Sequence, residues 1–302
     1  VKKIMEDHGG HLALDDREFL LLQATAESAA FSGGDGLSIT VGDMSVTIAE
    51  TADSDLVLDF SDTPLVIDTG AAPVTLDFDG SQGEIVQVTA HADLDIFGFV
   101  QVSGDFAFKK SEGAITLTDE SKLEADFLAI GATGADAFIG LNGGTDGALG
   151  FAATDVEFAL LLATDQEDDT RTWTTLLATA GSVGFVGSED LTLNGSGLSV
   201  QLTRASGGTP QIDFLAGPVE IATGPSSSIT IDLDTTAGPI TRAAGHLDLD
   251  VGGFFQATGD FVFEKTTQAF TLSDASTVQT DVLLLGADGV SAFVGNNGGT
   301  AD

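Results

Sequence analysis

The sequence contains no cysteine and no tyrosine, and it is poor in proline and in basic residues. Without cysteine it can form no disulfide, so its redox compartment cannot be inferred from disulfides. Only 10 Lys and Arg stand against 47 Asp and Glu, which gives a net charge of -37. Such a charge repels nucleic-acid phosphates and anionic lipid headgroups and attracts cations. We therefore expect no nucleic-acid partner and no membrane insertion.

Long apolar runs and common catalytic motifs are also missing from the sequence. No uninterrupted run of about 18 apolar residues is present, as a membrane-spanning helix would require. There is no nucleophile elbow, phosphate-binding glycine loop, H-E-x-x-H pair or Cys/His metal set. Because these absences leave no recognisable catalytic centre, we expect a protein that is not an enzyme.

What the chain does contain is a long internal repeat. HADLDIFGFVQVSGDFAFKK, which begins at His91, aligns without a gap with HLDLDVGGFFQATGDFVFEK, which begins at His246, at an offset of 155 residues. Upstream, PLVIDTG from Pro64 aligns with PVEIATG from Pro218 at an offset of 154 residues. We expect residues 1–18 to lie outside the repeat, a first unit at 19–172, and a second, truncated unit at 173–302 from a longer array.

Apolar residues alternate with polar ones along most of each unit. In SITIDLD the residues Ile229, Ile231 and Leu233 share one face, and in GDFVFEK the residues Phe261 and Phe263 do the same. A period of two is typical of strands with one buried face.

Two segments carry more specific predictions. FAFKKSEGAITL predicts a hairpin with its turn near residues 109–113. VLLLGADG, which is apolar on both faces, predicts a central strand.

These patterns predict an all-β fold with repetitive, mostly antiparallel strands. The strands are expected to form either an elongated β-sandwich or a solenoid-like stack, because the repeat favours units that bury their ends against their neighbours. Only residues 1–8 have a helical pattern, which predicts one short N-terminal helix. Trp173 opens a strand and is expected to lie in the core.

Pairs of aspartates two residues apart are the candidate metal ligands. The pairs are Asp77 and Asp79, Asp93 and Asp95, Asp232 and Asp234, and Asp248 and Asp250. On a strand, this spacing puts both carboxylates on one face. Two such strands side by side would gather four carboxylates, a ligand set suited to Ca²⁺. The alternative is a solvated acidic surface that binds no particular ion.

Two histidines precede D-x-D segments at equivalent places in the two units. His91 and His246 have no second nitrogen ligand nearby in the sequence. We therefore expect a structural or exposed role for both.

Two resemblances to known families follow from short motifs. The opening VKKIMEDHGGHLALDD resembles the C-terminal end of the ATP-binding domain of sensor histidine kinases. That family's phosphorylated histidine, nucleotide-binding asparagine and glycine lid have no counterpart in the sequence. Residues 1–18 therefore carry no prediction of ATP binding.

The rest of the chain resembles the repeat regions of giant secreted bacterial surface proteins, adhesin-like and haemolysin-type. GDFAFKK and GDFVFEK, AFIG and AFVG, and LTLNGSGLSVQL carry this resemblance. It implies an extracellular or cell-surface structural segment that adheres or assembles, with copies of itself, neighbouring repeats or surface glycans as partners, and with Ca²⁺ as a candidate cofactor. A self-assembling filament or sheath subunit and a secreted polysaccharide-binding or polysaccharide-active β-protein are the alternatives.

Overall fold

The computed structural model describes residues 18–32, 36–51, 56–68, 70, 73–188 and 190–295. The predicted helix at residues 1–8 and all but the last residue of the kinase-like segment lie outside the described residues.

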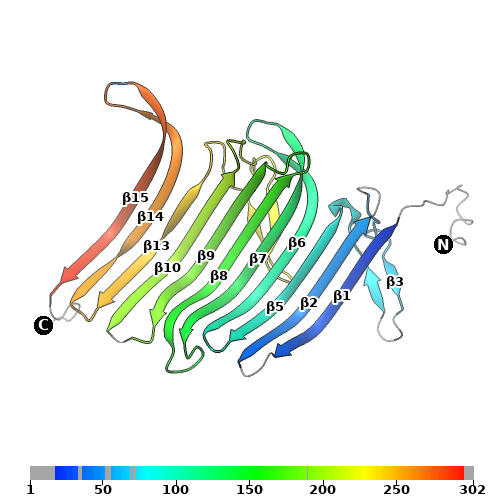
Figure 1. Ribbon diagram of the computed structural model, residues 1–302, viewed down its shortest axis with the longest axis horizontal. Coiled ribbons are helices and arrows are strands. Elements are labelled where there is room, and N and C mark those ends of the chain that lie inside the picture. The colour runs from blue at the N-terminus through cyan, green and yellow to red at the C-terminus, as the bar shows by residue number, and fades with distance from the viewer. Residues whose placement is uncertain are drawn as a thin grey trace, which may run out of the picture.

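The described chain is almost entirely β, which confirms the predicted fold class. Eleven long strands form one antiparallel sheet in the order β1-β2-β5-β6-β7-β8-β9-β10-β13-β14-β15 (Figure 1). These strands are β1 (Phe19–Ser32), β2 (Leu37–Thr51), β5 (Ile85–Ile96), β6 (Val100–Thr116), β7 (Lys122–Leu141), β8 (Leu149–Asp165), β9 (Thr172–Val186), β10 (Leu191–Ala205), β13 (Thr241–Val251), β14 (Phe255–Thr271) and β15 (Thr277–Val294).

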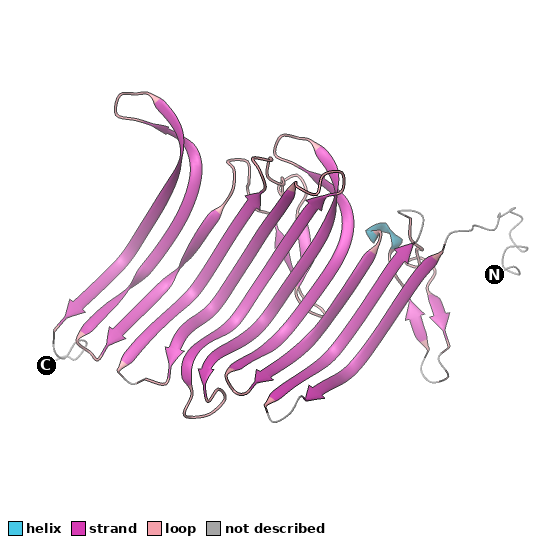
Figure 2. Ribbon diagram, viewed as in Figure 1, coloured by secondary structure: helices cyan, strands magenta, loops and turns pink. Residues whose placement is uncertain are grey.

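Two insertions interrupt the up-and-down order of the sheet. Each contains a small hairpin, and the first also contains the one short helix of the described residues (Figure 2). These elements are β3 (Leu65–Ile67), β4 (Val74–Leu76), the 3₁₀ helix η1 (Gly80–Gln82), β11 (Val219–Ala222) and β12 (Ser228–Ile231).

The sequence repeat is also a repeat of elements. β1, β2, the hairpin β3–β4 and the strands β5 to β7 recur in the same order as β9, β10, the hairpin β11–β12 and the strands β13 to β15. β8 connects the two sets, because it pairs with β7 on one side and β9 on the other. The sheet therefore runs without a break through the predicted unit boundary at residues 172 and 173.

The main core lies between the sheet and the second insertion. Ile212, Phe214, Ile221 and Ile231 of this insertion are buried against the sheet. The other buried residues of this cluster are Leu117, which directly follows β6, and the sheet residues Ile115, Ala125, Ala129, Ala159, Leu161, Ala163 and Trp173. The predicted core position of Trp173 is thus confirmed. Of the two predicted architectures, the elongated stack of strands is present as a single sheet. A sandwich would need a second layer over the whole sheet, and here only the two insertions form such a layer.

Two local predictions were wrong. Residues 109–113 form no turn, because β6 runs through them with Ser111 paired to both Ile85 and Phe127. The chain reverses instead near Phe97 and Glu120, which both have positive φ angles, of 54° and 67°. VLLLGADG lies in β15, which is an edge strand of the described sheet, although its repeat equivalent β7 is central.

The two faces of the sheet differ. The hairpin-side face is the one that carries Ala125, Leu161 and Trp173 beneath the second insertion, which lies behind β6 to β8 in Figure 1. Because side chains alternate along a strand, the neighbouring residues form the opposite face, which we call the open face. The large apolar side chains exposed on the open face are Leu20, Leu22 and Phe31 of β1, Phe108 of β6, Ile139 and Leu141 of β7, Leu149 and Phe151 of β8, Leu193 and Val200 of β10, Leu247 and Val251 of β13, Phe255 and Phe263 of β14, and Leu283, Leu285, Val290 and Val294 of β15.

Candidate functional site: two equivalent histidine–aspartate sites

Each repeat unit places one histidine opposite one aspartate on the hairpin-side face. His91 of β5 is registered with Asp105 of β6, and His246 of β13 with Asp260 of β14. In each case the imidazole Nδ1 lies close to the carboxylate Oδ1, at 2.7 Å in the first unit and 2.8 Å in the second. The turn at residues 97–99 and its equivalent after Val251 set this register.

The other imidazole nitrogen faces a second aspartate. His91 Nε2 lies 3.7 Å from Asp93 Oδ1, and His246 Nε2 lies 3.4 Å from Asp248 Oδ1. A hydroxyl on the next strand donates to this second carboxylate, Ser103 to Asp93 and its counterpart Thr258 to Asp248, both at 2.5 Å. We call these two groups the histidine–aspartate sites.

The flanking carboxylates change the proton affinity of both histidines. The hydrogen bond to Asp105 raises the pKa of His91, partial burial opposes this rise, and the charge of Asp93 adds to it. The pKa of His246 is raised in the same way, with the hydrogen bond to Asp260 as the largest cause. Each site thus favours an imidazolium held between two carboxylates.

The second site has the residue types of a nucleophilic triad but not its proton arrangement. His246 Nε2 lies 3.0 Å from the Thr258 hydroxyl oxygen, while its Nδ1 lies 2.8 Å from Asp260 Oδ1. A triad requires the hydroxyl to donate to the imidazole. Here Thr258 donates to Asp248 instead, so its oxygen accepts from the imidazole. This arrangement links two strands and does not activate a nucleophile.

Asp95 and Asp250 stabilise the turn between the paired strands. Asp95 accepts a hydrogen bond of 2.7 Å from the Gly98 N–H and another of 2.7 Å from Gln101 Nε2. Asp250 accepts the equivalent bonds from Gly253 and Gln256, at the same distances. Since each of these carboxylates already accepts two hydrogen bonds, its role in the structure is to shape the turn.

The remaining predicted ligands follow β4 and β12 and do not lie within strands. Asp77 accepts from Gln23 Nε2 at 3.2 Å, and Asp79 caps η1 by accepting from the Ser81 N–H at 2.9 Å. Asp234 accepts from both the N–H and the hydroxyl of Thr236. Asp232 is exposed to solvent.

The structure does not bring the four aspartate pairs together. The strands beside Asp93 are β2 and β6, which place Thr40 and Ser103 opposite it. Within the described residues, no group of three or more His, Asp or Glu side chains has the geometry to hold a metal ion. The Ca²⁺ site therefore remains a prediction from the sequence.

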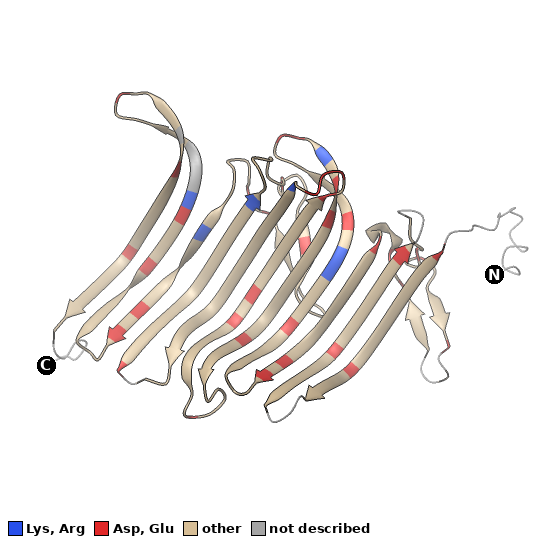
Figure 3. Cartoon of the chain, in the orientation of Figure 1, with Lys and Arg blue, Asp and Glu red and all other residues tan. Residues whose placement is uncertain are grey.

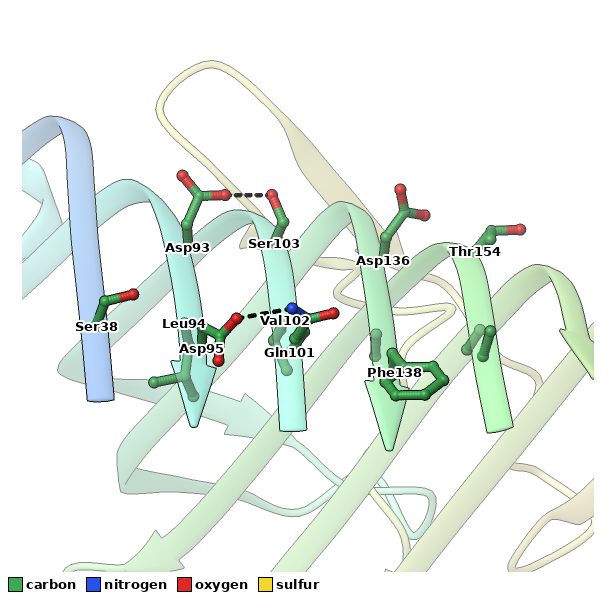
Figure 4. Close-up of a pocket in the computed structure, with 13 residues that line it drawn as sticks. Ser38, Asp93, Leu94, Asp95, Gln101, Val102, Ser103, Asp136, Phe138 and Thr154 are labelled. Atoms are coloured by element: carbon green, nitrogen blue, oxygen red, sulfur yellow. Dashed lines mark hydrogen bonds between the residues drawn. The ribbon is translucent and has the colours of Figure 1, made fainter. Parts of the chain in front are cut away.

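A shallow groove of about 470 Å³ crosses the sheet beside the first site. Asp93, Ser103 and Asp136 form a row across β5, β6 and β7 in this groove, and Asp95 and Gln101 lie next to them (Figure 4). Phe138 adds an apolar ring to the polar lining. Lys and Arg gather toward one end of the strands, away from this row (Figure 3).

The sequence patterns identified the histidine and the first aspartate pair of each site but not the residues on the neighbouring strand. Asp105 and Asp260, with Ser103 and Thr258, were not singled out, although both units contain the segment Q-x-[S/T]-G-D-F. The change from Ser to Thr preserves a hydroxyl, and this was the available signal. The misplaced turn at residues 109–113 hid the pairing of β5 with β6.

Comparisons with protein-family models, with curated proteins and with solved structures found no match to this chain. Among the described residues, no helix is long and apolar enough to cross a membrane.

Proposed function

We propose that this chain is a non-catalytic structural segment of a large exported bacterial surface protein, in which repeat units join edge to edge into an elongated acidic sheet. Adhesion or assembly at the cell surface is the role that such an extended segment serves. The histidine–aspartate sites and the aspartate-shaped turns stabilise each unit in this proposal.

The observation that carries the proposal is the packing between the two units. The hairpin β11–β12 belongs to the second unit, yet it lies against β6, β7 and β8 of the first. Ile212 and Ile221 of the second unit are buried there against Ala129 and Leu161. The main core of the described structure is therefore a junction between units, which is the mode of stabilisation in repeat arrays.

The first insertion leaves two equivalent apolar residues exposed, although Leu76 of β4 is buried. Leu58 and Ile67 are the equivalents of Ile212 and Ile221. Ile67 is 44% exposed, whereas Ile221 is 3% exposed. This difference supports a further unit as the natural neighbour of the first hairpin.

A lengthened chain tests the proposal. Inserting a second copy of residues 19–172 before Trp173 adds six strands to the sheet, by the count of β1, β2 and β5 to β8. At about 4.8 Å per strand the sheet should lengthen by roughly 30 Å. Small-angle X-ray scattering measures the maximum dimension. An unchanged dimension, or an inserted copy that stays unfolded by circular dichroism, would contradict the proposal.

A filament or sheath subunit is the second candidate, favoured by the edges of the sheet. β1 and β15 have only one neighbour each within the described sheet. Unpaired strand edges are templates for pairing with another chain. Electron microscopy of the purified chain distinguishes this candidate, because it predicts fibres.

A glycan-binding protein is the third candidate, favoured by the groove beside the first site. Carboxylate, amide and hydroxyl groups next to Phe138 suit the polar and apolar faces of a sugar. A glycan array compares the chain with its Asp93→Asn/Asp136→Asn variant, and a reducing-sugar assay tests for cleavage. Binding that the variant loses would favour this candidate, and no signal in either assay would reject it.

A further inference from the structure

We propose that the open face of the sheet is covered by a second copy of this chain, packed face to face so that the two hairpin-side faces point outward. This inference deepens the proposed function and rests on it, because it names the partner that a structural sheet of this kind requires.

The composition of the open face carries the inference. On β5, the open-face residues are Val86, Val88, Ala90, Ala92, Leu94 and Ile96, while the hairpin-side residues of the same strand include His91, Asp93 and Asp95. On β8, Val156, Phe158, Leu160 and Leu162 lie on the open face. Neither insertion packs on this face, because both lie against the hairpin-side face. Ala90 is buried among its neighbours in the sheet and the other named side chains are half-buried, whereas Leu285 on β15 is 76% exposed. Monomeric soluble proteins rarely expose apolar patches above a few hundred Å².

The face is large enough for a stable dimer. Eleven strands, spaced about 4.8 Å apart, make the sheet about 50 Å wide. Along each strand the alternation of apolar and polar residues extends over about ten residues, which at about 3.3 Å per residue gives a height of about 33 Å. The footprint is therefore about 1,600 Å², roughly twice the ~800 Å² that each partner contributes to a standard stable interface. Two twisted sheets pack face to face at a spacing of about 10 Å with their strands nearly aligned.

The charges at one end of this face favour a protein copy over a lipid surface. Glu50, Lys110, Glu112, Lys122 and Glu124 occupy open-face positions at one end of their strands. An apolar area that meets mixed charges at its rim is the usual anatomy of a protein interface, and this face has such a rim at one end. The net charge of -37 opposes binding to an anionic bilayer.

The test is the mass of the chain in solution. Sedimentation equilibrium in detergent-free buffer at micromolar concentration should give twice the 30.7 kDa of one chain. The Phe108→Lys/Val200→Lys variant places two charges on the open face, at side chains that are each 40% exposed. It should sediment as a monomer, with unchanged circular dichroism and unchanged fluorescence of buried Trp173.

The matched control adds one lysine to the opposite face at Thr179, which is exposed. Thr179→Lys should remain a dimer. A monomeric native chain would overturn the inference, and so would open-ended aggregates of indefinite mass. Co-sedimentation with phosphatidylcholine vesicles, lost in Phe108→Lys/Val200→Lys, would show a lipid occupant instead. If the dimer fails while the lengthened chain still extends in scattering, only this inference fails and the proposed function stands.

Discussion

The histidine–aspartate sites make stability depend on pH at the scale of single residues. The folded chain holds the protons of His91 and His246 more tightly than the unfolded chain, because folding raises both pKa values above 6.5. A raised folded-state pKa contributes stability that is complete below the unfolded value and is lost as pH rises through the folded value. These sites therefore stabilise the fold at mildly acidic pH and lose that contribution at alkaline pH.

We predict that the urea midpoint of unfolding decreases between pH 6 and pH 9. Trp173, the only tryptophan in the sequence, reports the transition by fluorescence. The His91→Gln/His246→Gln variant should show a smaller decrease, because it lacks both titrating groups. A midpoint that rises over this range, or an equal decrease in the variant, would show that the sites do not act in this way.

At the scale of elements, the insertion hairpins decide how firmly one unit is attached to the next. β11–β12 buries its apolar residues against the preceding unit, whereas Leu65 and Ile67 of β3–β4 are exposed. β12 and its equivalent β4 both bury an apolar residue, Ile231 and Leu76, so the two hairpins differ at β3 and β11: β3 is exposed where β11 is covered.

This pair of hairpins allows a matched substitution. Ile221→Ala should lower the free energy of unfolding by about 2–5 kcal/mol, because it leaves a cavity in the core between the units. Ile67→Ala, at the equivalent position, should cost less than about 1 kcal/mol, because its side chain is already exposed. Denaturant unfolding monitored by Trp173 measures both values. Equal losses would mean that Ile67 is covered in solution.

At the scale of the whole molecule, the net charge of -37 opposes folding by self-repulsion. Any cation that screens this charge should stabilise the sheet. A specific Ca²⁺ site would add stability beyond screening, as bound ligands do.

We predict that the melting temperature rises as NaCl increases from about 0.01 M to about 0.5 M, because the Debye length shortens over this range. At equal ionic strength, CaCl₂ and MgCl₂ should raise it equally, since the described residues form no metal-binding group of three or more carboxylates and histidines. Differential scanning calorimetry measures the shift. A larger gain in Ca²⁺, reduced in Asp93→Asn/Asp248→Asn, would restore the calcium site predicted from the sequence.

The local features of this protein follow from patterns of residue type along the chain. The period of two along SITIDLD predicts which of its residues face the core, and Ile231 is buried as expected. The offset of 155 puts His91 and His246 at equivalent positions, and in the structure each lies beside the matching aspartate, Asp105 or Asp260. Alternation and repetition can be recognised before any strand pairing is known, because both are patterns in the order of residues along the chain.

Which strands pair and which face is covered depends on contacts between residues far apart in the chain. The pairing of His91 with Asp105 depends on a turn at residues 97–99 that holds Phe97 at positive φ, an unusual conformation for a residue other than glycine. Asp93 faces Ser103, not another aspartate pair, because strand register sets the neighbours of a side chain. The alternation of β5 marks one face as polar and the other as apolar, but it does not say what lies on each. The folded sheet decides that the second insertion covers the hairpin-side face and leaves the open face apolar.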